Sequence, residues 1–317
     1  MDVHEAIITV EGLGHRYRTV RALREVSFSV GPGEIFGILG RNGAGKSTVI
    51  RVIAGLLSAS EGSIAVAGLH PRKNRAALRQ VLGVQLQDAE LHAALTVGEI
   101  VALYRSFYRR GKSASEVIRA VGLEDSTSTR FENLSGGQQQ RLSIALAMLG
   151  DPRILLLDEL TTGLDPDGRR AIWALVESVR DEGVTVVLVS HHMDEVERLC
   201  DRVLVLHEGT VLAEGSPADF VRQLGDFVRL SFASDDLASL EDLRSIDGVR
   251  DVAVRHDRFE LEVAADSLQS VERALESLEI AIHQRRVVYP NLEDAFLALL
   301  AAAAPESAAH QEQESAA

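Results

Sequence analysis

One glycine-rich stretch constrains this chain more than any other part of its sequence. It reads Gly40-Arg41-Asn42-Gly43-Ala44-Gly45-Lys46-Ser47-Thr48, and it lies between an apolar run at 35–39 and a helix-like run at 49–53. Glycines at such a turn let successive backbone N–H groups point at phosphate oxygens, and the helix adds the positive end of its dipole. We therefore expect a P-loop, a phosphate-binding turn between a strand and a helix of an α/β domain.

Two side chains of this turn have distinct expected roles. Lys46 is expected to reach the β- and γ-phosphates, and the hydroxyl of Ser47 to bind Mg²⁺, which prefers hard oxygen ligands. The other residues of the expected cradle are Gly40, Asn42, Gly43, Ala44, Gly45 and Thr48. The alternative is a glycine-rich turn without a ligand, and the flanking strand and helix make that alternative the weaker one.

Bulk composition excludes several classes of protein. A chain of 317 residues suggests two domains, and its formal charge of −14 argues against nucleic-acid binding through a broad basic face. A single cysteine, Cys200, excludes an internal disulfide bond and fits a reducing compartment. We see no pattern typical of a secretory signal and no run near the ~18 apolar residues of a membrane span. The chain is not expected to cross a membrane by itself.

The front of the chain mixes short strands with the phosphate-binding unit. We expect strands at 7–10, 26–30 and 62–68, and Tyr17 falls in the polar connection between the first two. This pattern predicts an antiparallel β-subdomain.

Residues 88–150 change to a helical pattern. Thr96 and Ser113 each begin a capping box, with Glu99 and Glu116 three residues later. Apolar residues follow both boxes at helical spacing, so we expect a helical subdomain inside the α/β domain.

Two buried strands are expected to deliver polar side chains to one edge of a sheet. The apolar run at 154–157 ends in Asp158-Glu159, and the run at 184–189 ends in Ser190-His191. Because ligands of open parallel sheets bind at the carboxyl ends of the strands, Asp158, Glu159 and His191 should converge on one crevice. Between the two strands, Asp165 should cap a helix.

The pattern changes again past Gly215-Ser216-Pro217. Strand-like and helical runs follow in the order β-α-β-β-α-β, which is that of a ferredoxin-like unit. We expect a first domain at 1–222, this small C-terminal α+β domain at 226–302, and a disordered tail at 303–317.

A second glycine pair also precedes a helical pattern. The sequence Ser135-Gly136-Gly137-Gln138 therefore marks a second candidate anion site at a helix N-terminus. By itself so short a pattern is more typical of an ordinary loop.

The order of the motifs removes that ambiguity. From about residue 7 to 219 the chain resembles the ATP-binding cassette (ABC) ATPases. The resemblance lies in the order of the motifs: a P-loop, Leu134-Ser135-Gly136-Gly137-Gln138, an apolar strand ending in Asp158-Glu159, Gly163-Leu164-Asp165 and a strand-end His191. The resemblance implies an α/β P-loop ATPase with antiparallel β and helical subdomains. It also implies ATP and Mg²⁺ as cofactors, and ATP hydrolysis as the activity.

The resemblance gives roles to matching residues around the phosphates. Asp158 matches the carboxylate that holds Mg²⁺ through water, Glu159 the base that activates the attacking water, and His191 the histidine that contacts the γ-phosphate. Gln87 matches the glutamine that senses Mg²⁺ and the water; Gln85 is its rival, and the spacing favours Gln87.

Further roles follow from the same resemblance. Tyr17 matches the aromatic residue that stacks on adenine, and a surface residue of a hairpin is the alternative. The loop Ser135–Gln138 acts on the nucleotide of an opposite subunit, and Asp165 links the two sites, which implies a second ATPase subunit and a homodimer. His192 is expected at a helix start on the surface. Leu160 departs from the family, which usually has proline there, but that proline supplies no ligand.

The sequences at 158–166, 190–195 and 290–297 resemble the ATPase subunits of ABC-2-type exporters, including the daunorubicin-resistance type. An exporter subunit of this kind would lie at the cytoplasmic face of the cell membrane, peripheral to an integral ABC-2 membrane subunit, and drive export of a drug, lipid or other small amphiphile. The alternative is a soluble cassette ATPase without transport, although such proteins usually have tandem cassettes or a long coiled coil. A P-loop kinase would leave Ser135–Gln138 and His191 unexplained.

Overall fold

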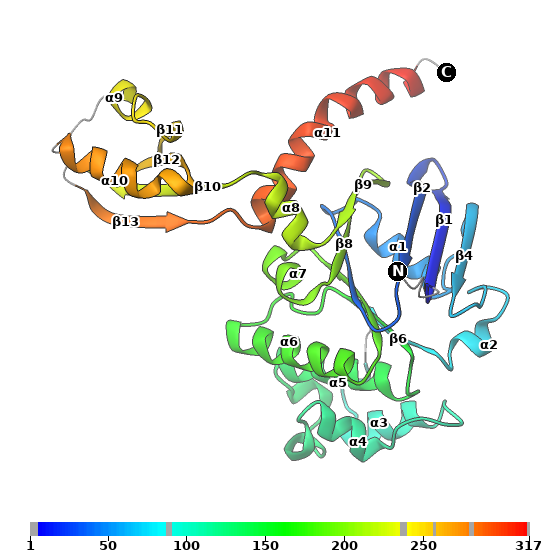
Figure 1. The fold of residues 1–317 in the computed structure, drawn as a ribbon. Coiled ribbons are helices and arrows are strands. Elements are labelled where there is room, and N and C mark those ends of the chain that lie inside the picture. Colours follow the sequence, from blue (N-terminus) through cyan, green and yellow to red (C-terminus); the bar gives the residue numbers. More distant parts are fainter. Residues whose placement is uncertain (1–5, 87–90, 235–239, 256–257, 279–281, 316–317) are drawn as a thin grey trace. The chain divides into compact units, whose positions relative to one another are not determined.

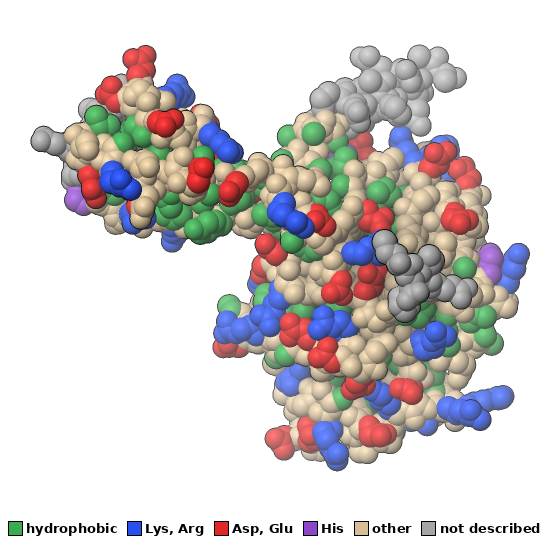
Figure 2. Space-filling model, in the orientation of Figure 1, with side chains coloured by type: hydrophobic (Ala, Val, Ile, Leu, Met, Phe, Trp, Pro, Cys, Tyr) green, Lys and Arg blue, Asp and Glu red, His purple; other side chains and the backbone are tan. Residues whose placement is uncertain are grey.

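The chain forms two compact units, Met1–Pro217 and Ala218–Ala317 (Figure 1). The structure is a computed structural model, and it describes residues 6–86, 91–234, 240–255, 258–278 and 282–315. Figure 2 shows acidic and basic side chains interspersed on the face in view.

A six-stranded sheet is the centre of the first unit, with the order β5-β6-β7-β3-β8-β9. Its strands are β3 (Ile35–Leu39), β5 (Leu82–Gln85), β6 (Ile154–Asp158), β7 (Thr185–Ser190), β8 (Arg202–His207) and β9 (Thr210–Gly215). Neighbouring strands are parallel except β8 and β9. Every residue of β3, β6 and β7 is buried, as the unbroken apolar runs predict.

The second sheet of this unit is antiparallel, with the order β2-β1-β4. Its strands are β1 (Ile8–Tyr17), β2 (Val20–Val30) and β4 (Glu61–Val66). The expected strands at 7–10 and 26–30 were too short, and placing Tyr17 in a connection was wrong, since Tyr17 ends β1 and pairs with Val20. Irregularities in the β1–β2 register beyond Val10 let the pairing continue past glycines that would otherwise end a strand.

Helices surround the sheets of the first unit. They include α1 (Lys46–Ile53), α2 (Arg75–Leu78), α6 (Pro166–Asp181) and α7 (Met193–Leu199). The helical subdomain contains α3 (Val97–Arg105), α4 (Ala114–Ala120), η1 (Glu124–Ser126), η2 (Phe131–Asn133) and α5 (Gly136–Met148). Both predicted capping boxes are present. Hydrogen bonds from the backbone and hydroxyl of Thr96 lower the pKa of Glu99.

Helix α5 packs closely on β5 because Gly83 has no side chain. A Cβ at Gly83 would lie 2.2 Å from the carbonyl oxygen of Ala147, closer than real Cβ contacts. The close contact fixes α5, which begins at the second glycine pair, against β5 at the edge of the six-stranded sheet.

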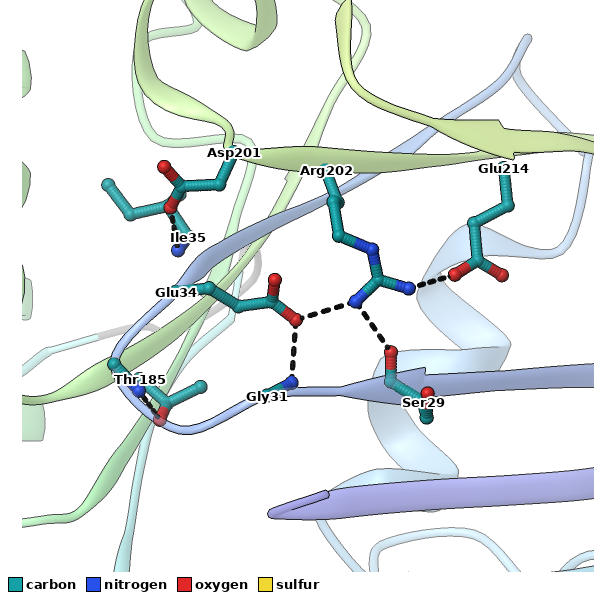
Figure 3. Close-up of polar contacts among 9 residues, drawn as sticks. Ser29, Gly31, Glu34, Ile35, Thr185, Asp201, Arg202 and Glu214 are labelled. Carbon is teal, nitrogen blue, oxygen red and sulfur yellow. Dashed lines mark hydrogen bonds and ion pairs between the residues drawn. The ribbon is translucent and has the colours of Figure 1, made fainter. Parts of the chain in front are cut away.

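A polar network fixes the amino-terminal end of β3 (Figure 3). The guanidinium of Arg202 donates to Glu34 Oε1 at 2.9 Å, to the Ser29 carbonyl at 3.3 Å and to Glu214. Its partners come from β2, the turn before β3, and β9. Arg202 therefore holds the two sheets of the first unit together at the end opposite the phosphate-binding turn.

The second unit has the predicted β-α-β-β-α-β order. Its elements are β10 (Phe227–Ala233), α9 (Leu240–Arg244), β11 (Val249–Arg255), β12 (Arg258–Ala264), η3 (Ala265–Ser267), α10 (Leu268–Ser277) and β13 (His283–Val288), preceded by α8 (Pro217–Gln223) and followed by α11 (Leu292–Ser315). Its sheet is antiparallel with the order β11-β12-β10-β13, so the first and third strands are central, as in a ferredoxin-like unit.

Helix α11 is longer than its sequence pattern predicts. We expected the last helix to end near Ala302 and a disordered tail at 303–317, but the chain is helical to Ser315. Alanine has the highest intrinsic helix propensity, and the alanines around Pro305 favour continuation of the helix. Within the described ranges, no helix combines the length and the apolar content that crossing a membrane requires.

Candidate functional site: a phosphate cradle beside three strand ends

The phosphate cradle lies between β3 and α1, as predicted. Gly45 has a φ of +104°, and a Cβ there would lie 2.7 Å from Leu23 Cδ2 and 2.8 Å from the Ala22 carbonyl oxygen. A Cβ at Gly40 would lie 2.5 Å from the carbonyl oxygen of Leu206. Both positions therefore require glycine, Gly45 for its backbone conformation and both for close packing.

The Lys46 side chain folds back over this cradle. Its ammonium donates to the carbonyl oxygens of Gly40 at 2.7 Å and Arg41 at 3.1 Å, and the residue is only 5% exposed. Burial lowers the pKa of Lys46, while the nearby carboxylates of Glu159 and Asp158 act in the opposite direction. A buried cation whose partners are carbonyl oxygens of the cradle itself fits the expected role of binding phosphate oxygens in their place.

The strand ends converge as the sequence predicted. In the sheet register, Asp158 pairs with Val189, and Leu39, the residue before the cradle, pairs with Ser190. Asp158 is buried and lines, with Ser47, a cavity of about 530 Å³. The hydroxyl and the carboxylate are hard oxygen donors on one cavity, and such a pair fits Mg²⁺.

Glu159 and His191 form the polar pair next to Asp158. Glu159 Oε1 lies 3.2 Å from His191 Nδ1, and the Glu159 backbone N–H donates to the Val189 carbonyl at 2.9 Å. Glu159 has a φ of +51°, in the left-handed region that non-glycine residues rarely adopt. Such strained backbone persists only where the surrounding structure holds it in place, and it is concentrated at functional sites.

The second glycine loop, Ser135–Gln138, caps α5. Gln138 N–H donates to Ser135 Oγ at 3.3 Å, and Ser135 N–H donates to Gln138 Oε1 at 2.9 Å. This loop and Asp165 line a different cavity, of about 450 Å³. Among the described residues, the two cavities have no lining residue in common. One chain therefore presents the glycine-rich turn before α1 and the glycine pair before α5 at separate cavities.

Tyr17, Gln85 and Gln87 are the remaining candidate site residues from the sequence. Tyr17 is 40% exposed, and its ring meets that of His15 edge to face at 4.5 Å. Gln87 lies outside the described residues. Gln85 is buried, and its side-chain oxygen accepts the backbone N–H of Asp158 at 3.0 Å. The rival glutamine thus supports the backbone of the candidate metal ligand.

One buried carboxyl group next to this site was not predicted from the sequence. Glu195, in the first turn of α7, is 0% exposed and accepts a hydrogen bond from Trp173 Nε1 at 3.2 Å. An acidic residue at a helix start is usually a solvated one, so the sequence held no signal for its burial. His192 precedes α7 at the capping position and is half-buried, so it is less exposed than expected.

This combination of fold and site defines a class. A phosphate-binding turn between a buried strand and a helix, with two carboxylates and a histidine at neighbouring strand ends, is the arrangement of a P-loop nucleoside triphosphatase.

Comparison with known proteins identifies the family. The family model described as ABC transporter matches residues 23–162. The linearmycin resistance ATP-binding protein LnrL of Bacillus subtilis is 34% identical over 304 residues, which cover 92% of this chain and 98% of that protein. The Nod factor export ATP-binding protein I of Bradyrhizobium diazoefficiens is 36% identical over 315 residues, with coverages of 94% and 98%.

Solved structures agree with this assignment. The cbiO1 protein of Clostridium perfringens, part of the ABC transporter complex cbiONQ, aligns with a TM-score of 0.62 and 31% identity, covering 69% of this chain and 92% of that one. A dimeric ATP-binding cassette bound to ADP and Pi aligns with a TM-score of 0.61 and 28% identity, with coverages of 66% and 98%. The chain belongs to the ATPase subunits of the ABC transporter family.

Proposed function

We propose that this chain is the ATPase subunit of an ABC-2-type exporter, and that it works as a pair of chains at the cytoplasmic face of the cell membrane. One observation carries the proposal: Lys46, Asp158, Glu159 and His191 meet at one cradle, while Ser135–Gln138 and Asp165 face a separate cavity. The relatives named for linearmycin resistance and Nod factor export support an export role. The proposed cargo is a drug, a lipid or another small amphiphile.

The cradle binds the triphosphate through its backbone N–H groups and Lys46, while Tyr17 stacks on adenine. Mg²⁺ would be held by Ser47 and Asp158, with Gln87 as the further ligand that the family pattern implies. When bound, the cation neutralises charge on the β- and γ-phosphates. Asp158→Asn should remove the enhancement of ATP affinity by Mg²⁺, measured by equilibrium binding with and without the cation.

Hydrolysis then depends mainly on positioning, because phosphoryl transfer leaves little covalent chemistry for the protein. The Glu159 carboxylate orients and deprotonates the attacking water, and His191, 3.2 Å away, contacts the γ-phosphate. Glu159→Gln should keep ATP bound and stop turnover. Glu132→Gln, an exposed carboxylate on η2, is the matched control and should hydrolyse ATP at the parent rate.

Two chains would close on two ATP molecules, each held by one cradle and the opposite Ser135–Gln138 loop. ATP would hold the pair together, and hydrolysis would release it. ATP shifts the equilibrium of the pair between its open and closed states. A membrane subunit coupled to that change would open its cargo site to one side of the membrane and then to the other.

We assign the contact with the membrane subunit to the cavity that Ser47 and Asp158 share. Its lining includes Leu56, Tyr104 and Phe107, and the Leu56 and Phe107 side chains are 56% and 67% exposed. A partner seated there would lie close to the metal-binding residues. Leu56→Ser and Phe107→Ser should prevent recovery of the chain with its membrane subunit while leaving the basal ATPase rate unchanged.

Purification from membranes tests the exporter proposal against the soluble alternative. We expect the full chain to be recovered with an integral membrane subunit, and the pair to export its cargo only with ATP. If the chain were found with ribosomes or DNA and with no membrane protein, the soluble cassette ATPase would be the correct function.

A further inference from the structure

His15 is a buried histidine that the proposed chemistry does not use. It lies on β1 two residues before Tyr17, and it is only 8% exposed, whereas Tyr17 is 40% exposed. The two rings meet edge to face, with their centroids 4.5 Å apart and their planes at 76°. Aromatic rings prefer this arrangement because the positive edge of one ring meets the negative face of the other.

A hydrogen bond fixes the orientation of the His15 ring. Its Nδ1 atom lies 2.9 Å from the carbonyl oxygen of Ser58. A carbonyl oxygen can only accept, so Nδ1 carries the hydrogen and donates it. Burial and this bond together restrict the rotation of the ring, and His15 therefore presents a fixed surface to Tyr17.

The bond also joins β1 to the cradle helix. Ser58 lies in the segment between α1, which begins at the phosphate cradle, and β4. The same segment makes two more bonds to β1, since the Ser60 N–H donates to the Gly14 carbonyl at 2.8 Å and its hydroxyl accepts the Arg16 N–H at 3.4 Å. These bonds lie on both sides of His15, so the strand is anchored where this ring lies.

Tyr17 needs such support if it is to bind adenine. It is the last residue of β1, and within the described ranges His15 is the one aromatic partner of its ring. An exposed side chain that is free to rotate loses conformational entropy when it stacks on a ligand. A ring that is already held in place loses less, so its contact with the base contributes more to the affinity.

We propose that His15 is a positioning residue for ATP binding, which holds the Tyr17 ring in the orientation that stacks on adenine. His15 does not contact the nucleotide in this proposal. It acts through Tyr17, and its bond to Ser58 fixes the adenine-binding ring relative to the helix of the phosphate cradle. The inference rests on the proposed stacking of Tyr17 on adenine.

Two substitutions separate the ring of His15 from its hydrogen bond. His15→Asn removes the ring and keeps an N–H donor close to the position of Nδ1, whereas His15→Phe keeps a ring and removes the donor. Both should lower the Tm, His15→Asn through lost packing and His15→Phe through the lost bond to Ser58. A difference in ATP affinity between the two variants therefore reports on the ring rather than on stability.

Equilibrium binding is measured in the Glu159→Gln chain, where ATP is not turned over. His15→Asn should weaken ATP binding about fivefold, since an edge-to-face ring pair contributes roughly two- to tenfold to an equilibrium constant. His15→Phe should stay within about twofold of the parent. Inorganic tripolyphosphate with Mg²⁺ lacks adenine, and both variants should bind it as the parent does.

Two further chains complete the test. Adding His15→Asn to Tyr17→Ala should weaken ATP binding no further, because no Tyr17 ring is left to position. His70→Asn is the matched control. His70 is an exposed histidine whose Nδ1 accepts the Arg72 N–H at 3.2 Å, and its variant should keep the parent affinity for both ligands.

Parent ATP affinity in His15→Asn, combined with weakened binding in Tyr17→Ala, would refute the positioning role and leave the adenine contact intact. Equal losses of ATP and tripolyphosphate affinity in His15→Asn would also refute it, since they would show general damage to the site. Unchanged ATP affinity in Tyr17→Ala would overturn both the adenine contact and the role of His15. The ATPase proposal is tested separately, because Glu159→Gln and Asp158→Asn report on the base and the cation.

Discussion

Gly137→Asp should leave the folding of the single chain intact and prevent two chains from pairing and hydrolysing ATP. A Cβ at Gly137 meets no heavy atom within 4 Å among the described residues, so the side chain has room. Gly137 is the second residue of α5, where a carboxylate near the helix N-terminus stabilises by about 0.3–1 kcal/mol. The Tm of the Gly137→Asp chain should therefore equal or slightly exceed that of the parent.

The same carboxylate would lie against the γ-phosphate of the opposite chain's ATP. At a separation of about 4 Å and an effective dielectric constant of about 20, two like charges repel by roughly 4 kcal/mol, which is about a thousandfold in an equilibrium constant. Since the site is closed when the charges meet, salt should screen this repulsion little. We expect ATP-dependent pairing and ATP hydrolysis to be lost from a well-folded chain.

Light scattering of the Glu159→Gln chain in saturating ATP, with and without Gly137→Asp, measures the pairing. Gly45→Ala is the contrasting variant, because its φ of +104° and its 2.7 Å contact make it strained within the single chain. It should lower the Tm and abolish ATP binding by the monomer. Gly137→Asp should do neither.

Mixing two inactive chains extends the test. A Lys46→Ala chain paired with a Gly137→Asp chain forms one site with both lesions and one intact site, so the mixture should regain ATPase activity that neither chain has alone. A site shared between two chains would be refuted if Gly137→Asp alone hydrolysed ATP normally, or if the Glu159→Gln chain stayed monomeric in saturating ATP both alone and with its membrane subunit.

Further changes, in the first unit and at the start of the second, give additional tests. Tyr17→Ala should weaken ATP affinity with little change in kcat, and unchanged affinity would make Tyr17 a surface residue only. Burial lowers the pKa of Lys46 in the free chain, and a bound phosphate should raise it. At a pH between these two pKa values ATP binding therefore takes up a proton, and the affinity for ATP falls as the pH rises above the lower pKa. Calorimetry in two buffers of different ionisation enthalpy measures the proton uptake. Arg202→Ala should lower the free energy of unfolding by about 1–2 kcal/mol, because its partners are partly solvated, with ATP affinity unchanged. Ending the chain after Arg222 should leave ATP binding intact and weaken association, and a folded truncated chain without ATP affinity would contradict this.

The phosphate cradle and the strand ends were predictable because local sequence determines them. A buried parallel strand must be apolar throughout, and a turn that wraps phosphate must be rich in glycine, so both features appear as short contiguous patterns. The capping boxes are equally local, since their hydrogen bonds join residues three apart.

Features that depend on distant residues were not predictable. The pairing of Tyr17 with Val20 depends on irregularities in the register of two long strands, which the glycines of β1 concealed. The burial of Glu195 depends on Thr161, Ser190 and Trp173 reaching one point from separate elements. The support of Asp158 by Gln85 likewise requires the neighbouring strand order, which no single segment encodes.

The left-handed backbone of Glu159 has a consequence for how such a chain changes under selection. A residue held at a φ of +51° costs on the order of 1 kcal/mol, and glycine at the same place would avoid most of that cost. Selection for heat resistance alone would therefore favour the loss of this glutamate. Libraries screened only for survival after heating should accumulate Glu159→Gly chains that are more durable than the parent and unable to turn over ATP.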